Sequence, residues 1–171
     1  MNRKRNHIIS FFAGFLILTA ADQWTKWLAV SYLKGKAPYV LWDGVFEFLY
    51  SENRGAAFGM LQGKRAFFFA VAAAVFAFVL FAMAKMPAKR RYVPMEVCLT
   101  MIASGAAGNL VDRVSQGYVV DFLYFKLIDF PIFNVADCYV TVGTALLFVL
   151  FMWFYRDEEL EMLFPHRKER S

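Results

Sequence analysis

The sequence has little charge, few histidines and few cysteines. Only 19% of its 171 residues are charged, whereas 60% are hydrophobic, and the mean hydropathy is +0.44. Soluble domains carry about 25% charged residues, so this composition indicates an integral membrane protein. The 19 Lys and Arg outnumber the 14 Asp and Glu, but most of them stand in short flanks beside apolar segments. They form no basic face, so we expect no binding to nucleic acid.

The scarcity of histidine and cysteine excludes several kinds of site. Both histidines, His7 and His166, lie in the terminal flanks, away from the polar motifs, so a His-activated nucleophile is excluded. Cys98 and Cys138 begin the third and fourth apolar segments, which places them on opposite sides of a core about 30 Å thick. A disulfide requires Cα atoms within about 7 Å, so we expect two free thiols. Cys–His metal spacing is also absent.

Two other kinds of site remain as alternatives. No serine stands at a motif-like spacing from the outer lysines, which leaves little basis for a Ser–Lys dyad. A hard cation held by carboxylates and asparagines alone is the other alternative. We expect no metal and no cofactor.

Four apolar segments predict a mainly α membrane protein that folds as one domain over residues 1–171. About 20 apolar residues span a bilayer, so we expect four transmembrane helices. They cover residues about 8–28, 66–84, 94–113 and 137–155. The first segment has a basic start and ends Thr19-Ala20-Ala21, as a cleavable signal peptide does. We favour a retained helix, because apolar residues continue past that point and Trp24 and Trp27 suit a membrane interface.

The basic residues predict the orientation. They cluster at the N-terminus, at residues 85–91 and in the C-terminal tail, so we expect both termini in the cytoplasm. Lys64 and Arg65 fall on the other side and weaken this pattern slightly. Four crossings then place the two long loops, at about 31–65 and 114–136, outside the cytoplasm.

Both outer loops contain a strand-like stretch. In residues 45–51 the chain alternates, with Phe46, Phe48 and Tyr50 on one side. Residues 118–125 are rich in aromatic and β-branched side chains, which favour strands. We expect two strands that form a small platform on the lipid surface.

Polar residues gather on the predicted outer side of this apolar chain. Ionisable groups at membrane depth are costly, so their presence indicates a functional site. Two aspartates in a partly dry site cannot both ionise easily, so one keeps a proton while the other activates water. We interpret Asp121 and Asp137 as such a catalytic pair, which titrates as a unit. The other polar residues on this side are Asp22, Lys26, Asn53, Asn109, Asp112, Arg113 and Asn134.

Several of these residues also have a purely structural interpretation. Asn134, three residues before Asp137, has the spacing of a helix N-cap with an acid in the first turn. Asp121 is compatible with a solvated loop acid. We expect Arg113 to pair with Asp112 and hold the end of the third helix. The convergence of these residues on one side of the membrane favours a functional site.

Five blocks follow one another along the chain. They read D-Q-W-T-K at 22–26, N-R-G-A-A-F-G at 53–59, G-N-L-V-D-R at 108–113, G-Y-V-V-D-F at 117–122 and F-N-V-A-D at 133–137. In order and spacing the chain resembles the lipoprotein signal peptidases, the bacterial signal peptidase II family, over nearly its whole length. One departure is Cys138, where the family often has a small hydroxyl residue.

The resemblance implies a fold and an activity. The implied fold has four transmembrane helices and a small extracytoplasmic β-cradle. The implied activity is that of an intramembrane aspartyl endopeptidase, which removes signal peptides from diacylglyceryl-modified prolipoproteins and cuts just before the lipidated cysteine. The catalytic dyad falls on Asp121 and Asp137. Substrate-binding positions fall on Asn53, Asn109, Arg113 and Asn134, and structural support on Asp22 and Lys26, to which we add Asp112.

The resemblance also implies partners and a location. The partners are lipid-modified prolipoproteins, membrane lipid and globomycin-type peptide inhibitors, and the location is the bacterial inner membrane with the active site on the extracytoplasmic side. A small transporter is a competing class, because buried acids also mark ion pathways. Against it, the acids cluster at one surface and residues 66–84 carry none. A scaffold with the strands as a docking surface is a third class.

Overall fold

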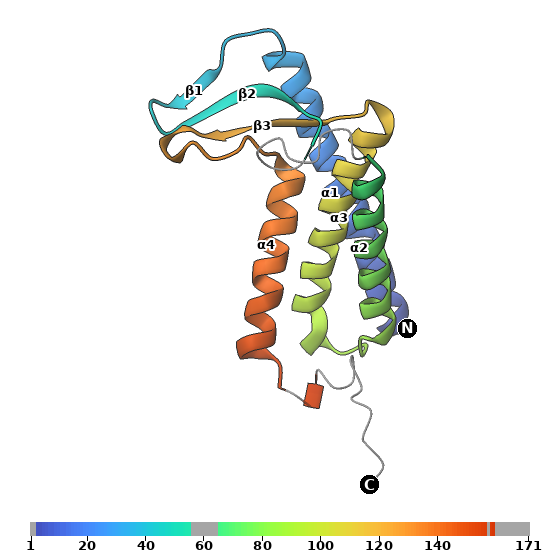
Figure 1. Ribbon diagram of the computed structural model, residues 1–171. Coiled ribbons are helices and arrows are strands. Elements are labelled where there is room, and N and C mark those ends of the chain that lie inside the picture. The colour runs from blue at the N-terminus through green and yellow to red at the C-terminus, as the bar shows by residue number, and fades with distance from the viewer. Residues whose placement is uncertain (1–2, 56–64, 157, 160–171) are drawn as a thin grey trace.

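Four long helices stand side by side beneath a small antiparallel sheet (Figure 1). This computed structural model describes residues 3–55, 65–156 and 158–159. Residues 56–59 of the second block, Lys64, His166 and the basic part of the tail lie outside this range. The helices are α1 (Arg3–Leu33), α2 (Arg65–Lys85), α3 (Val93–Ser115) and α4 (Val135–Val149), and the strands are β1 (Tyr39–Trp42), β2 (Phe46–Asn53) and β3 (Val119–Phe125).

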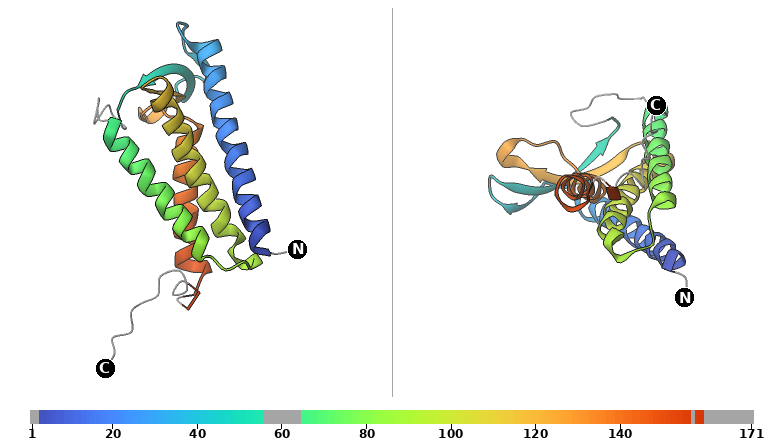
Figure 2. Two further views of the ribbon diagram at one scale, coloured as in Figure 1. Left: turned by 90° about the vertical axis from the view of Figure 1, so that its right-hand side faces the viewer. Right: turned by 90° about the horizontal axis from the view of Figure 1, so that it is seen from below.

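Helix α3 is the centre of the bundle. It packs against α1, α2 and α4, and Figure 2 shows it between α1 and α2. Small residues let the helices approach closely: a Cβ added at Gly105 would overlap the carbonyl oxygen of Ala136 and a methyl group of Val140. A Cβ at Gly108 would likewise overlap the carboxylate of Asp22. Close contact with α1 and α4 therefore depends on these two glycines.

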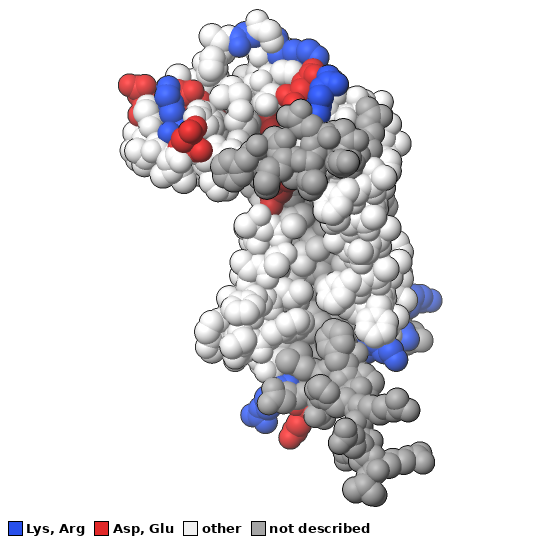
Figure 3. All heavy atoms as spheres, in the orientation of Figure 1, with Lys and Arg blue, Asp and Glu red and all other residues white. Residues whose placement is uncertain are grey.

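Three of the described helices are long and apolar enough to cross a membrane: Lys4–Leu33, Ala66–Lys85 and Val135–Phe154. Large apolar side chains are exposed along them, and Figure 3 shows an uncharged band between charged residues at the two ends of the molecule. Helix α3 does not have this apolar character, because it carries the polar side chains that the other helices surround. The prediction of a mainly helical membrane protein with a small sheet is confirmed.

The helix ends differ from the expected bounds. Helix α1 runs from Arg3 to Leu33, beyond the expected 8–28 at both ends. Helix α4 starts at Val135 and finishes in a π turn at Leu150–Phe154. The side chain of Arg91, from the short 3₁₀ helix η2 (Arg90–Tyr92), donates to the carbonyl oxygen of Phe154 and so holds this end of α4 against the α2–α3 turn.

The sheet has three strands in the order β1-β2-β3, one more than expected. All four residues of β1 are exposed, so the strand lacks the alternation that reveals a strand in a sequence. On β3, Val120 and Phe122 pack with Ala29 and Leu33 of the C-terminal part of α1. Successive side chains of a strand point to opposite faces, so Asp121 points away from this apolar cluster.

Candidate active site

Asp121 and Asp137 are held by one shared residue, Asn134. Asp121 lies on β3, whereas Asp137 lies in the first turn of α4. The Asn134 side-chain Nδ2 donates to Asp121 Oδ1 at 2.6 Å, and its backbone N–H donates to Asp137 Oδ2 at 3.1 Å. The two carboxylates, which are 16 positions apart in the sequence, are therefore both hydrogen-bonded to a single residue.

Two more asparagines complete the bonding of this pair. Asn53 on β2 donates from Nδ2 to Asp121 Oδ2 at 2.8 Å, and Asn109 on α3 donates from Nδ2 to Asp137 Oδ1 at 2.8 Å. Each of the four carboxylate oxygens thus accepts one N–H group. The orientation of both acids is set by three asparagines from three different segments.

Asn134 is also the N-cap of α4. Its side chain accepts from the backbone N–H of Asp137 at 3.0 Å, while Asp137 accepts from the backbone of Asn134, which is a capping box. The structural interpretation of Asn134 is thereby confirmed. The same residue holds the carboxylate of Asp121, so one side chain both starts the helix and connects the two acids.

The two acids have different surroundings. Asp121 is only 2% exposed, so the interpretation as a solvated loop acid is wrong. Asp137 is half-buried and reaches two cavities. Burial, followed by the nearby charge of Asp137, raises the pKa of Asp121 to about 7, against the opposing effect of the Asn53 and Asn134 amides. The surroundings of Asp121 therefore disfavour its charged form.

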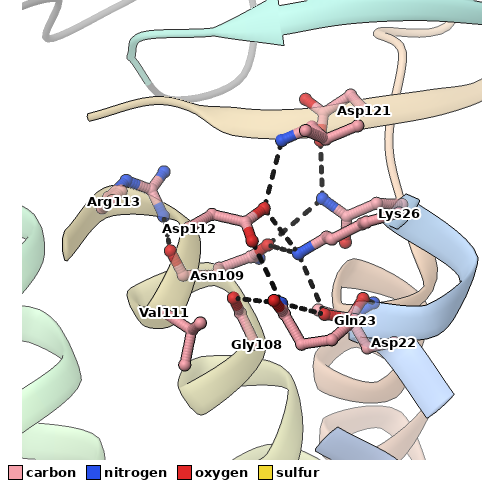
Figure 4. A network of polar contacts seen from close by, with 12 residues as sticks. Asp22, Gln23, Lys26, Gly108, Asn109, Val111, Asp112, Arg113 and Asp121 are labelled. Atoms are coloured by element: carbon pink, nitrogen blue, oxygen red, sulfur yellow. Dashed lines mark hydrogen bonds and ion pairs between the residues drawn. The ribbon is translucent and has the colours of Figure 1, made fainter. Parts of the chain in front are cut away.

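A buried cation, Lys26, contacts one of the asparagines that hold the pair. Lys26 on α1 is 3% exposed, and its Nζ lies 3.0 Å from Asp22 Oδ2 and 3.0 Å from Asp112 Oδ2 (Figure 4). The same Nζ donates to Asn109 Oδ1 at 3.0 Å. Because this bond engages the oxygen of the Asn109 amide, the nitrogen of that amide is directed to Asp137.

The two acids that pair with Lys26, Asp22 on α1 and Asp112 on α3, also bind the backbone of the segments that carry the dyad. Asp22 Oδ1 accepts from the backbone N–H of Ala136 at 2.8 Å, and Asp112 Oδ2 accepts from that of Val120 at 3.1 Å. The start of α4 and the strand β3 are thus hydrogen-bonded to the same charged cluster. Asp22, Lys26 and Asp112 act as one unit that sets the distance between the segments carrying Asp121 and Asp137.

Gln23 belongs to this cluster, although the sequence analysis assigned it no role. Its Nε2 donates to Asp22 Oδ2 at 3.2 Å, to Asp112 Oδ1 at 3.0 Å and to the Gly108 carbonyl at 3.1 Å. The sequence signal that could have indicated this role is the position of Gln23 next to Asp22 in the first block. Figure 4 shows Gln23 between the α1 and α3 members of the network.

The expected Arg113–Asp112 pair is wrong. Neighbouring residues on a helix do not face each other, and Asp112 turns to Lys26. Arg113 donates instead to the carbonyl oxygens of Asn109 and Gly55, each at 3.2 Å, and its guanidinium lies 4.2 Å from the ring centre of Phe68. Arg113 therefore joins α3 to the segment after β2 and faces the cavities.

Two cavities meet at Asp137. One of about 250 Å³ lies between α2, α3 and α4, and another of about 540 Å³ extends under the segment before α4. Both are mainly apolar, and the residues that line both are Phe68, Arg113, Asp137 and Thr141. A few polar groups in a largely apolar hollow suit a ligand that carries both a peptide backbone and hydrocarbon. Among the described residues, no group of three or more His, Cys, Asp or Glu is placed to hold a metal ion.

Both cysteines are free thiols, but only one reaches the site. Cys98 is 2% exposed in the bundle core, whereas Cys138 lines the larger cavity next to Asp137. We predict that a membrane-permeant thiol reagent lowers any activity of this site roughly tenfold or more, because the added group occupies the cavity next to Asp137. Cys138→Ser should be resistant to the reagent. Unchanged turnover of fully labelled wild-type protein would contradict this placement.

The chain is similar to known proteins over most of its length. Residues 14–154 match the family described as signal peptidase (SPase) II. A lipoprotein signal peptidase of Caldanaerobacter subterraneus subsp. tengcongensis is 45% identical over 141 residues, which cover 82% of this chain and 90% of that protein. The lipoprotein signal peptidase of Brevibacillus brevis is 40% identical over 131 residues, or 77% of this chain and 87% of that protein.

Solved structures of bacterial membrane enzymes are also similar to the chain. A bacterial membrane enzyme solved by the in meso method superposes with a TM-score of 0.74 at 27% identity, and the match covers 96% of both chains. A second such enzyme has a TM-score of 0.73 at 28% identity and covers 86% of this chain. Together with the three candidate spans, these matches indicate a multi-pass membrane protein. The family match over residues 14–154 and the 45% identity to a curated relative show that the chain belongs to the signal peptidase II family.

Proposed function

We propose that this protein removes signal peptides from diacylglyceryl-modified prolipoproteins and hydrolyses the peptide bond just before the lipidated cysteine. Its relatives are named lipoprotein signal peptidases, which supports the substrate class. The observation that carries the proposal is the pair Asp121 and Asp137, bridged by Asn134 at the meeting point of two apolar cavities. We infer an aspartyl endopeptidase that uses these two acids and no cofactor.

The different burial of the two acids supports separate roles. Ionised Asp137, which is open to the cavities, takes a proton from water, and the resulting hydroxide attacks the peptide carbonyl carbon. Protonated Asp121 donates its proton to the carbonyl oxygen. When the tetrahedral intermediate breaks down, the proton taken up by Asp137 passes to the amine leaving group and the C–N bond is cleaved. One hydroxyl proton of the intermediate returns to Asp121 as the carbonyl group re-forms, which regenerates both acids. The oxygen of water remains in the new carboxylate of the signal peptide.

The polar residues around the dyad have binding roles in this proposal. Asn53, Asn109 and Asn134 hold the two acids. Asn53 and Asn109 also each line one of the cavities, where they can contact a substrate backbone, whereas Asn134 is completely buried and acts through the acids that it holds. Arg113 lies in both cavities and offers a cation to the substrate carbonyls. The apolar walls accept the hydrocarbon of the lipidated cysteine. Globomycin-type peptides are expected to occupy the same cavities.

The proposed membrane topology has four crossings. Helix α3 packs along the three helices that have the length and hydropathy of spans, so we infer that it is the fourth. The basic residues at the N-terminus and at the α2–α3 turn support cytoplasmic termini. The dyad then lies on the extracytoplasmic side of the bacterial inner membrane. The exposed apolar residues of β1, which include Leu41 and Trp42, support contact between the sheet and lipid.

The proposal is tested with purified protein in detergent and two versions of one prolipoprotein, with and without the diacylglyceryl group. We expect cleavage of the lipidated version only, with product masses that place the cut just before the modified cysteine. A globomycin-type peptide should inhibit the reaction, whereas a chelator should leave the rate unchanged. Equal cleavage of the unlipidated version would contradict the substrate class, and loss of activity with chelator would favour a metal site.

The raised pKa of Asp121 predicts the pH dependence of this reaction. The reactive form needs Asp121 protonated, so kcat/KM should fall as the pH rises through about 7, by about tenfold per unit well above it. The Asn53 amide stabilises ionised Asp121, so Asn53→Ala should raise this pKa and move the alkaline limb to higher pH. A rate that is constant from pH 6 to 9 would contradict the assignment of Asp121 as the acid.

A further inference from the structure

A second polar site lies in the half of the bundle that holds the N-terminus. A cavity of about 440 Å³ opens between α1 and α3 and shares no lining residue with the two cavities at Asp137. Its polar end contains His7 and Glu96. Its apolar part follows one face of α1 along Gly14, Ile17 and Leu18. None of these residues takes part in the proposed reaction.

The acid in this cavity has only one side-chain partner among the described residues. Glu96 is 5% exposed and lies in the first turn of α3, where its Oε2 contacts His7 Nδ1 of α1. Its other oxygen, Oε1, accepts no hydrogen bond from the part of the chain that the structure describes. A carboxylate at membrane depth is costly unless it is paired or hydrogen-bonded, so this oxygen suits a ligand with a charged N–H donor.

The length of the cavity matches one membrane leaflet. Helix α1 rises about 1.5 Å per residue, so the lining from His7 to Leu18 extends over about 16 Å. Half of a hydrocarbon core about 30 Å thick is about 15 Å. Glu96 lies in the first turn of α3. With this end of the bundle at the membrane surface, Glu96 is at head-group depth and Leu18 is near the middle of the bilayer. Gly14 adds no side chain to the lining, and it also lets α1 approach α3 closely, since a Cβ there would come within 3.1 Å of Thr100 Cγ2.

We propose that this cavity binds a phospholipid with a primary ammonium head group, taken from the leaflet on the side of the N-terminus. The ammonium group donates to Glu96 Oε1, and one acyl chain lies along Gly14 towards Leu18. The exposed cation Lys4 is about one turn closer to the N-terminus than His7 on the same helix, in position to attract the phosphate. Charge complementarity at both ends of the head group therefore selects this occupant over an uncharged chain or a neighbouring helix.

The test uses delipidated protein in detergent and three phospholipids with the same acyl chains. They are phosphatidylethanolamine, phosphatidylcholine and phosphatidylglycerol, and native mass spectrometry measures the occupancy of each. We expect phosphatidylethanolamine to bind about tenfold more tightly than the other two, since phosphatidylcholine has no N–H donor and phosphatidylglycerol has no cation. Equal or tighter binding of either competitor by the wild-type protein would overturn the proposal, and this comparison requires no variant to fold.

Two variants locate the site. Glu96→Gln should bind the three lipids within about threefold of one another, because the charge that selects the ammonium group is gone. Gly14→Leu should weaken binding of all three about tenfold by filling the chain channel. Ala74→Leu adds the same side chain at an exposed position of α2 and is the control. Wild-type lipid preference in Glu96→Gln, or wild-type affinity in Gly14→Leu, would show that the lipid binds elsewhere.

Discussion

Asp121→Asn and Asp137→Asn should each lower kcat for the lipidated substrate by about 10³-fold or more. Each substitution keeps the size of the side chain but removes a group that must carry or accept a proton in the proposed reaction. Asp43→Asn, an exposed acid in the β1–β2 turn, is the matched control and should retain wild-type activity. The measurement is single-turnover cleavage of the lipidated prolipoprotein at pH 6.5, a pH chosen below the expected pKa of Asp121.

The double variant separates a catalytic pair from two independent effects. Groups that act as a unit have non-additive effects on rate. The double variant Asp121→Asn/Asp137→Asn should therefore be at most about tenfold slower than the slower of the two single variants. Thermal unfolding of the variants checks that the fold is retained. If either single variant cleaves at the wild-type rate, the dyad is incorrectly assigned, whatever the substrate class.

Lys26→Met should destabilise the protein by about 3–5 kcal/mol, because it removes one partner of a buried charge cluster. Asp22 and Asp112 would both be left without their cation, in surroundings where they are almost completely buried. Lys34→Met is the matched control: Lys34 pairs with Glu52 at 3.2 Å, but its side chain is 50% exposed. A surface pair of this kind contributes about 0.2–1 kcal/mol. Denaturant unfolding in one detergent measures both variants.

Lys26→Met should also lower activity at temperatures where the variant is still folded. Without the Lys26 bond, the Asn109 oxygen keeps only the Asn134 Nδ2 as a donor, at 3.1 Å, so the Asn109 amide holds its nitrogen on Asp137 less firmly. We expect kcat to fall about 10²-fold, in line with the cost of small displacements of reacting groups. Wild-type kcat together with wild-type stability would show that the cluster neither supports the bundle nor positions the dyad.

The contacts of individual polar residues were only partly predictable. The spacing of Asp22 and Lys26 on a helix indicates an i, i+4 pair, and that pair forms at 3.0 Å. The expected pair of Arg113 with Asp112 did not form, because adjacent residues on a helix point in different directions and the partner of each depends on the packed neighbour. Gln23 was missed for a related reason, since its three hydrogen bonds depend on how α1 packs against α3.

The strands of the sheet were also only partly predictable from the sequence. Strand β2 was recognised from its alternating apolar residues, whereas β1, with four exposed residues, had no such pattern. Burial of Asp121 was not predicted, because it results from pairing of β3 with β2, where Asp121 faces Ser51, a residue 70 positions away. Pairing between such distant segments is set by the packed fold and leaves no periodic signal in either segment.

The sequence by itself determined the chemical class of this protein: apolar segments long enough for a bilayer, an excess of polar residues on one predicted side, and five ordered blocks of one peptidase family. These features depend on composition and local spacing, which any folded or unfolded form of the chain retains. Only the tertiary structure decided which acid is buried, which residue bridges the pair and which cation supports it. Those properties arise from distances between segments far apart in the chain, and such distances exist only after the helices and the sheet have packed.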